Sequence, residues 1–220
     1  METVQLKNHI SKRKEKIQFI VIHDTGNTAL GAGATAHKNY FMTTVRKASA
    51  DFVVEENEII KLNDYEKYFT WHCGDGKGKY GITNSNSVGI EMCVNADSNM
   101  QKTINTTIKL TYQLMQELNL KHTRVVRHYD ASRKICPASM RADDWKKWWN
   151  FKDALREYTA MMKSDRNLML LKLGQKSAVY ETVLTNGYNF IKIRDLLEFL
   201  GYEIESYSKT EIIIREQGKG

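Results

Sequence analysis

The chain alternates short apolar runs with stretches in which apolar residues recur at helical spacing. Residues 17–22 (IQFIVI) and 88–94 (VGIEMCV) are typical of buried strands, and two β-rich runs joined by polar residues at 51–62 predict a hairpin. Helices are predicted for three amphipathic segments: 34–45, 103–118 and 143–158. This alternation predicts an α/β domain with a mixed central β-sheet flanked by helices.

The pattern changes beyond this first domain, which is predicted to span residues 1–158. Residues 159–167 are polar and aperiodic, which predicts a linker. In residues 168–220, short β-rich runs surround one segment of helical spacing at 191–199. The sequence therefore predicts a second, small C-terminal α+β domain.

Length and composition exclude several classes of protein. With 220 residues, 41% hydrophobic and 27% charged, the chain suits one medium domain and a small appendage, and a single proline with 13 glycines excludes collagen-like and disordered chains. No window approaches the roughly 20 apolar residues of a membrane span, and the basic N-terminus lacks the apolar segment of a signal peptide. We therefore expect synthesis in the cytoplasm and no membrane partner.

The net charge of +7 comes almost wholly from the first domain, because residues 159–220 hold nine basic and eight acidic side chains. Such a charge is compatible with nucleic acid, anionic membranes or the anionic polymers of a bacterial wall. A basic helix and a stacking motif are both missing from the sequence, which argues against a nucleic-acid partner. Three cysteines are too few for a disulfide framework, so we expect reduced thiols.

Three residues of types that bind metals lie at or beyond the ends of apolar runs. His23 ends the first strand, His128 follows Val-Val-Arg, and Cys136 lies eight residues further on. One such histidine is more often a structural residue, and a single cysteine more often belongs to the core. Together, two imidazoles and a thiol match a catalytic zinc site, in which three protein ligands leave a fourth position open. The sequence therefore predicts one Zn²⁺ per chain.

Two further residues suit catalysis at such a site. Glu91 interrupts an apolar strand, where an unpaired carboxylate costs several kcal/mol unless a cation or water matches it, so it is a candidate general base. Lys134, two residues before Cys136, is a candidate for stabilising an oxyanion. The alternative interpretation of Lys134 is an ordinary basic residue of a solvated loop.

Four segments with these residues resemble one family: the zinc-dependent N-acetylmuramoyl-L-alanine amidases of the type-2 class, which are related to peptidoglycan-recognition proteins and common among bacteriophage endolysins. The resemblance covers residues 17 to about 150. The matching segments are FIVIHDTGN around His23, WHCGDGKG at 71–78, NSNSVGIEMCVN around Glu91 and RHYDASRKICP at 127–137. The resemblance implies the type-2 amidase fold and hydrolysis of the amide between the lactyl group of N-acetylmuramic acid and L-alanine.

The resemblance also implies roles for individual side chains. It makes His23, His128 and Cys136 the zinc ligands, Glu91 the general base and Lys134 the group that stabilises the tetrahedral intermediate. Four residues in or beside the motifs are expected to line the substrate groove: Trp71, His72, Asn86 and Asn95, with Trp71 equally suited to the core.

One segment and two cysteines near the motifs need separate interpretations. Many family members have an aromatic residue or histidine in the segment that here reads SADF (49–52), which predicts a different cleft wall and stem-peptide preference. Cys73 and Cys93 are interpreted as packing residues, because the implied ligand set is complete without them.

The C-terminal segment resembles the small repeat domain found at the N-terminus of some copper amine oxidases and on many cell-surface proteins of Gram-positive bacteria. In endolysins a unit in this place usually targets the wall, so the implied partner is Gram-positive peptidoglycan. The alternatives are a stabilising module and a module that forms a homodimer.

The layout favours a phage or prophage endolysin that waits in the cytoplasm, acts on the cell wall after release and lyses the host. The alternative is a non-catalytic peptidoglycan receptor on the same fold. It is disfavoured because such receptors often lose the cysteine ligand, whereas this chain keeps Cys136 together with Glu91.

Overall fold

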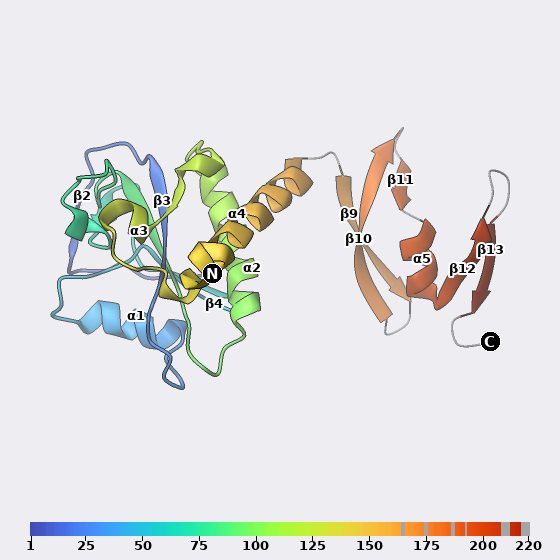
Figure 1. The fold of residues 1–220 in the computed structure, drawn as a ribbon, viewed down its shortest axis with the longest axis horizontal. Helices are drawn as coiled ribbons and strands as arrows, with labels where there is room; N and C mark the ends of the chain where they lie inside the picture. Colours follow the sequence, from blue (N-terminus) through green and yellow to red (C-terminus); the bar gives the residue numbers. More distant parts are fainter. Residues whose placement is uncertain (164–165, 174–175, 186–187, 192, 208–211, 217–220) are drawn as a thin grey trace. The chain divides into compact units, whose positions relative to one another are not determined.

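The computed structural model describes the chain except residues 164–165, 174–175, 186–187, 192, 208–211 and 217–220 (Figure 1). The chain divides into two compact units, Met1–Tyr158 and Thr159–Gly220. Each unit is described by itself. No helix among the described residues is long and apolar enough to cross a bilayer.

A six-stranded mixed sheet forms the centre of the first unit. In spatial order its strands are β1 (Glu2–Thr3), β5 (Glu58–Lys61), β4 (Phe52–Glu55), β7 (Ser87–Met92), β3 (Phe19–Asp24) and β8 (Val125–Arg127). Only the β4–β5 hairpin is antiparallel within this sheet. A separate two-stranded sheet pairs β2 (Ile10–Lys12) with β6 (Tyr68–Thr70). The antiparallel pair of β4 and β5 confirms the hairpin predicted at 51–62.

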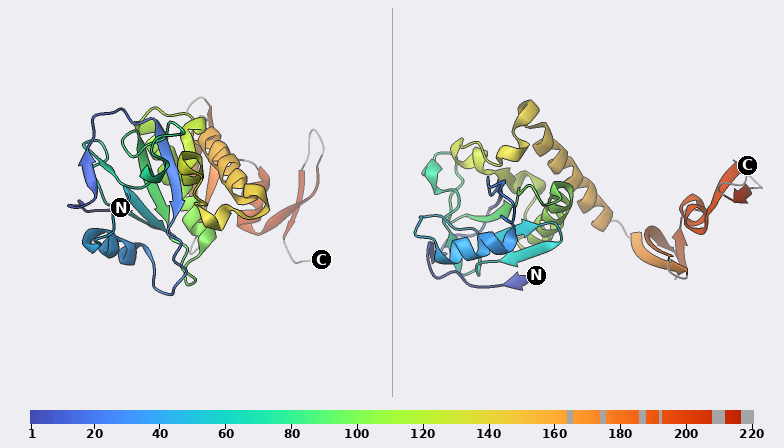
Figure 2. Two further views of the ribbon diagram at one scale, coloured as in Figure 1. Left: turned by 60° about the vertical axis from the view of Figure 1, so that its left-hand side comes forward. Right: turned by 90° about the horizontal axis from the view of Figure 1, so that it is seen from below.

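Helices cover both faces of this sheet (Figure 2). On one face, α2 (Met100–Glu117) and α4 (Ala142–Lys163) bury the larger apolar core, whose side chains include Ile20, Ile22, Val88, Ile90, Leu114, Trp148 and Leu155. On the other face, α1 (Ala34–Thr43) packs against β4 and β5. The remaining short helices are α3 (His128–Ser132) and the 3₁₀ turns η1 (Gly74–Gly76), η2 (His122–Arg124) and η3 (Ala138–Met140). The mixed α/β architecture predicted from the sequence is confirmed.

The alternation of side chains along β3 and β7 determines which residues face the functional side. Ile22 and Ile90 point into the core beneath α2, so their neighbours His23 and Glu91 point to the opposite face. The parallel pairing of the two strands places His23 directly opposite Glu91. Two residues separated by 68 positions in sequence thus become neighbours on one face.

The second unit contains a three-stranded sheet in the order β11 (Tyr188–Ile191), β10 (Lys176–Thr185) and β9 (Arg166–Leu173). It also contains helix α5 (Ile193–Leu200), which contacts β12, and a two-stranded sheet of β12 (Tyr202–Tyr207) and β13 (Ile212–Glu216). Gly201 ends α5 at φ +88°, a left-handed conformation that favours glycine.

The structure differs from the sequence pattern in two respects. Helix α4 continues to Lys163, so the first half of the expected linker at 159–167 is helical, and Thr159 is buried. Residues 164–165 of that linker lie outside the described residues. In addition, the sequence did not predict strands β1, β2, β6, β11 and β12. Strands this short or polar have little apolar pattern of their own and are stabilised by pairing with neighbouring strands.

Candidate active site

The three candidate metal-binding residues identified in the sequence come together in the first unit. His23 lies near the end of β3, His128 begins α3, and Cys136 follows in the loop after α3. Their ligand atoms all lie within 4.8 Å of one another, and Cys136 Sγ is 3.6 Å from His23 Nδ1. Ordinary Zn–N and Zn–S bond lengths put tetrahedral ligand atoms roughly 3.3–3.7 Å apart. The cluster therefore has dimensions close to those of a zinc site.

The hydrogen bonding of the two imidazoles fits a metal at this point. His128 uses Nε2 to bond Asp75 Oδ1 at 2.7 Å, and its Nδ1 is buried with no hydrogen-bond partner. His23 uses Nε2 to bond His72 Nδ1 at 3.0 Å, which leaves Nδ1 facing Cys136. Each ring thus has one nitrogen held by the protein and the other turned toward the cluster, as in metal-ligating histidines. The buried nitrogen of His128 is the observation that most directly supports metal binding.

Burial also favours the protonation states that metal binding requires in the histidines. It lowers the pKa of both His23 and His128, so that both rings are neutral and their lone pairs are available. Burial raises the pKa of the Cys136 thiol, and a coordinated metal ion would reverse this by displacing the proton. The donor set of two neutral imidazoles and one sulfur suits zinc.

Asp75 is a site residue that the sequence analysis did not single out. Its loop lies against α3, where a Cβ on Gly76 would lie 2.0 Å from the carbonyl oxygen of Ala131. Only glycine permits this approach, which brings the Asp75 carboxylate to His128 across 53 positions of sequence. The segment WHCGDGKG contained the residue, but nothing local indicated which imidazole it would meet.

Glu91 lies beside the cluster, with one carboxylate oxygen near His23 and the other without a hydrogen-bond partner. Its Oε1 is 3.9 Å from His23 Nδ1, and its buried Oε2 makes no hydrogen bond. Burial raises the pKa of Glu91 to about 8, with a further increase from Asp24 and an opposing effect of Lys134. A carboxyl group with a pKa near neutrality can both accept and donate a proton, as a general acid–base requires.

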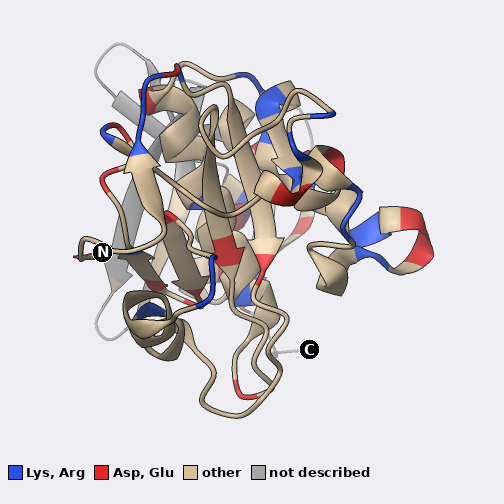
Figure 3. Ribbon diagram, turned by 90° about the vertical axis from the view of Figure 1, so that its left-hand side faces the viewer, with Lys and Arg blue, Asp and Glu red and all other residues tan. Residues whose placement is uncertain are grey.

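Two hollows in the surface adjoin the cluster. One is lined by Glu91 together with Thr25, Asn27, His37, Tyr40 and Arg46, and the other by His128 and Lys134 together with Lys47, Trp71, His72 and Asp75. Glu91 therefore faces the first hollow and His128 of the metal cluster faces the second. Figure 3 shows that Lys and Arg lie mostly on the loops and helices around the sheet.

The four residues expected in the substrate groove are placed differently from one another. Trp71 and His72 line the second hollow, although His72 is only 9% exposed. Asn86 instead closes its own loop by bonding the N–H of Thr83 and the carbonyl of Gly81. Asn95 donates to Glu55 and Asp97, and neither asparagine lines the two hollows described above.

Residues 49–52 do not form the cleft wall that the sequence suggested. All four are at most 2% exposed, and the Asp51 carboxylate accepts hydrogen bonds from Asn63, Thr70 and the N–H of Gly89. These bonds tie β4, β6 and β7 together, which explains a buried carboxylate there. The preceding residues Arg46 and Lys47 line the hollows instead.

The fold of the first unit matches that of the catalytic domain of an amidase, XlyA. Residues 13–139 match the family model of N-acetylmuramoyl-L-alanine amidases. The chain belongs to this amidase family.

Individual relatives agree with this assignment. The N-acetylmuramoyl-L-alanine amidase CwlH of Bacillus subtilis (strain 168) is 35% identical over 132 residues, which cover 60% of this chain and 51% of CwlH. The chain thus spans about half the length of that curated relative. The catalytic domain of XlyA has 32% identity and a TM-score of 0.60, with 70% of this chain and 99% of that domain covered. The amidase CwlA of a Bacillus species is 24% identical over 203 residues, covering 89% of this chain and 78% of CwlA.

Proposed function

We propose that this chain is a zinc-dependent N-acetylmuramoyl-L-alanine amidase that hydrolyses the amide between the lactyl group of N-acetylmuramic acid and the L-alanine of the stem peptide. The main support is the His23–His128–Cys136 cluster, in which the Nδ1 of His128 is buried without a partner. Family membership supports the bond that is cut.

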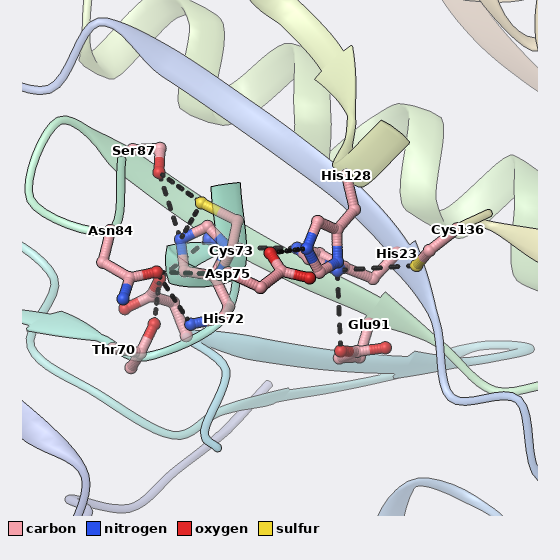
Figure 4. A network of polar contacts seen from close by, with 12 residues as sticks. His23, Thr70, His72, Cys73, Asp75, Asn84, Ser87, Glu91, His128 and Cys136 are labelled. Atoms are coloured by element: carbon pink, nitrogen blue, oxygen red, sulfur yellow. Dashed lines mark hydrogen bonds and ion pairs between the residues drawn. The ribbon is translucent and has the colours of Figure 1, made fainter. Parts of the chain in front are cut away.

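The proposed metal is one Zn²⁺ held by His23, His128 and Cys136 (Figure 4). When bound, zinc supplies a Lewis acid that polarises a carbonyl and lowers the pKa of a water molecule toward about 7. Asp75 orients His128, since its carboxylate accepts the proton of His128 Nε2.

Glu91 is the proposed general base. Its raised pKa and its free Oε2 suit a carboxylate that takes a proton from the attacking water and passes it to the departing amine of L-alanine. Because the Glu91 side chain is largely buried, the proton is held close to the reacting atoms rather than lost to solvent.

Lys134 is the proposed stabiliser of the developing oxyanion. It lines the same hollow as His128, and its positive charge lowers the pKa values of Glu91, His128 and His23. A cation beside the cluster favours the negative charge that would form on the carbonyl oxygen. Trp71 and His72 line the adjoining wall, where the substrate would lie.

The proposed partner is Gram-positive peptidoglycan, in keeping with the Bacillus relatives. The alignment with CwlA extends beyond the first unit into the second. We propose that the second unit binds the cell wall, and that the protein acts there as an endolysin after release from the cytoplasm. A homodimer through this unit is the alternative role.

Mass spectrometry of digested Gram-positive peptidoglycan tests this function. The digestion is run untreated, with a chelator, and with zinc restored. Stem peptides with a free L-alanine amino group should appear, vanish with chelator and return with zinc. Bound zinc without any released peptide would favour a non-catalytic peptidoglycan receptor, whereas release that is insensitive to chelator would contradict the metal site.

A further inference from the structure

A chain of hydrogen bonds runs from His23 away from the metal cluster (Figure 4). His23 Nε2 lies 3.0 Å from His72 Nδ1, and His72 Nε2 lies 3.1 Å from Ser87 Oγ. The Ser87 hydroxyl in turn donates to the backbone carbonyl of Thr83. His23, His72 and Ser87 are all buried, so water does not compete for these bonds.

The direction of every bond in this chain follows from its last member. A carbonyl oxygen can only accept, so the single proton of the Ser87 hydroxyl is used at Thr83. Ser87 Oγ must then accept from His72, whose proton lies on Nε2. A neutral imidazole carries one proton, so His72 Nδ1 accepts from His23 Nε2. His23 is left with its lone pair on Nδ1, the nitrogen that faces Cys136 Sγ at 3.6 Å.

His72 is a neutral residue held firmly in this orientation. Burial lowers its pKa to about 3. The Asn84 side chain accepts from the backbone N–H groups of His72 and Cys73, at 3.0 and 2.7 Å. Space for the ring comes from Gly89 on β7, where an added Cβ would lie 2.7 Å from His72 Cγ. A glycine within a buried strand otherwise weakens it, so its presence here is explained by the imidazole that it accommodates.

We propose that His72 and Ser87 are positioning residues that fix the tautomer of His23, so that its Nδ1 is presented to the metal. This inference rests on the zinc site proposed above. His23 and His128 are then oriented toward the metal by different partners. Asp75 is an acceptor by its own chemistry and fixes His128 directly, whereas His72 becomes an acceptor only through Ser87 and the carbonyl of Thr83.

Two substitutions of His72 separate positioning from packing. An asparagine side chain ends where Nδ1 of histidine lies, and a glutamine side chain reaches the position of Nε2. His72→Asn should therefore keep an acceptor for His23, and His72→Gln should lose it although its volume is closer to that of histidine. If His72 only filled space, glutamine would be the better replacement.

Zinc affinity, measured on the full chain by competition with a chromophoric chelator, is the first readout. His72→Gln and Ser87→Ala should weaken zinc binding about 10- to 100-fold, the usual effect of losing a group that orients a metal-binding side chain by a hydrogen bond, and His72→Asn should remain closer to the wild type. The matched control is Cys73→Ala, because its sulfur packs 4.0 Å from His72 Nε2 and 3.7 Å from Ser87 Oγ but is not a member of the chain of directed bonds. That variant should bind zinc as the wild type does, with circular dichroism confirming the fold of each protein.

The tautomer itself is the second readout, measured by two-bond ¹H–¹⁵N correlations in the zinc-free full chain at one fixed pH. His23 should carry its proton on Nε2 in the wild type, and this single tautomer should be lost in Ser87→Ala. A proton on Nδ1 in the wild type overturns the inference, as do unchanged zinc affinities in both His72→Gln and Ser87→Ala, or an equal loss in Cys73→Ala. Neither readout requires turnover, so failure of the amidase proposal would be seen separately in the peptidoglycan digestion.

Discussion

Glu91 lies directly opposite His23 in the parallel pairing of β7 with β3, and its Oε1 is 3.9 Å from His23 Nδ1. Strand geometry alone puts the two side chains on one face, because paired residues in adjacent strands point the same way. The carboxylate is thereby held next to a candidate metal ligand by the backbone of the central sheet. Because both residues lie on strands of the central sheet, the position of the Glu91 carboxylate relative to His23 varies little.

Replacing Glu91 by glutamine should preserve zinc binding and lower turnover about 100- to 10,000-fold, the usual contribution of a general base. The amide keeps the shape of the side chain but cannot take a proton from water. The measurements are kcat on a soluble muramoyl-peptide and zinc content per chain. Glu58→Gln, at an exposed position of β5, is the control. Near-normal turnover in Glu91→Gln would assign the base to another residue.

Replacing Cys136 by serine should strongly weaken zinc binding and abolish turnover, because a hydroxyl is a much poorer zinc ligand than a thiolate. Zinc retained after dialysis, measured by atomic absorption, checks the first effect. Cys93→Ser is the matched control, since Cys93 is equally buried but lies outside the ligand cluster. A fully active Cys136→Ser protein would overturn the proposed site.

Asp75→Ala should raise the zinc dissociation constant about 10- to 100-fold, because it removes the acceptor that orients His128. Chelator competition gives this constant, and kcat should fall in parallel. Asp153→Ala, on the exposed side of α4, provides a carboxylate control. Equal zinc affinities for the two variants would show that His128 does not need its carboxylate partner.

Lys152→Met should lower the free energy of unfolding of the first unit by about 1–3 kcal/mol, the usual cost of taking a donor away from buried acceptors. Lys152 is 6% exposed, and its Nζ donates to the carbonyl of Val125 at 2.7 Å and to that of His122. Urea unfolding measures the change, with Lys147→Met at an exposed position of the same helix as control. A loss no larger than the control's would mean that these bonds add no net stability.

The same lysine predicts a pH dependence. Burial lowers its pKa to about 8 in the folded protein, below the ordinary value of 10.5. Between these two values the unfolded chain binds more protons, so the contribution of Lys152 to stability rises with pH. The difference in unfolding free energy between wild type and Lys152→Met should therefore widen from pH 8 to pH 10. A constant difference would show that the pKa of Lys152 is unshifted.

Removal of the second unit should leave hydrolysis of soluble fragments intact and reduce binding to whole cell walls. The cut belongs after Lys163 rather than after residue 158, because α4 continues to Lys163 and Thr159 is buried. Co-sedimentation with purified walls measures the binding. Unchanged sedimentation of the shortened chain would favour a stabilising or dimer-forming role for that unit.

The sequence by itself determined most of the local structure of the first domain. Runs such as 17–22 and 88–94 became β3 and β7, because a short continuous apolar segment suits a strand that is buried on both faces of a sheet. The helices at 34–45 and 103–118 likewise followed from spacing. The types of residue at positions 23, 128 and 136 indicated a metal, since ligand chemistry depends on the side chain alone.

Only the tertiary structure decided which residues orient His23 and His128. The contacts of Asp75 with His128 and of His72 with His23 join segments 53 and 49 positions apart, and the packing of η1 on α3 and the space over Gly89 create them. A local sequence pattern cannot predict contacts between residues so far apart in the chain. The same holds for Asp51, whose burial depends on strands that pair around it. Sequence thus specified the groups that can bind a metal, and long-range packing specified how each is oriented.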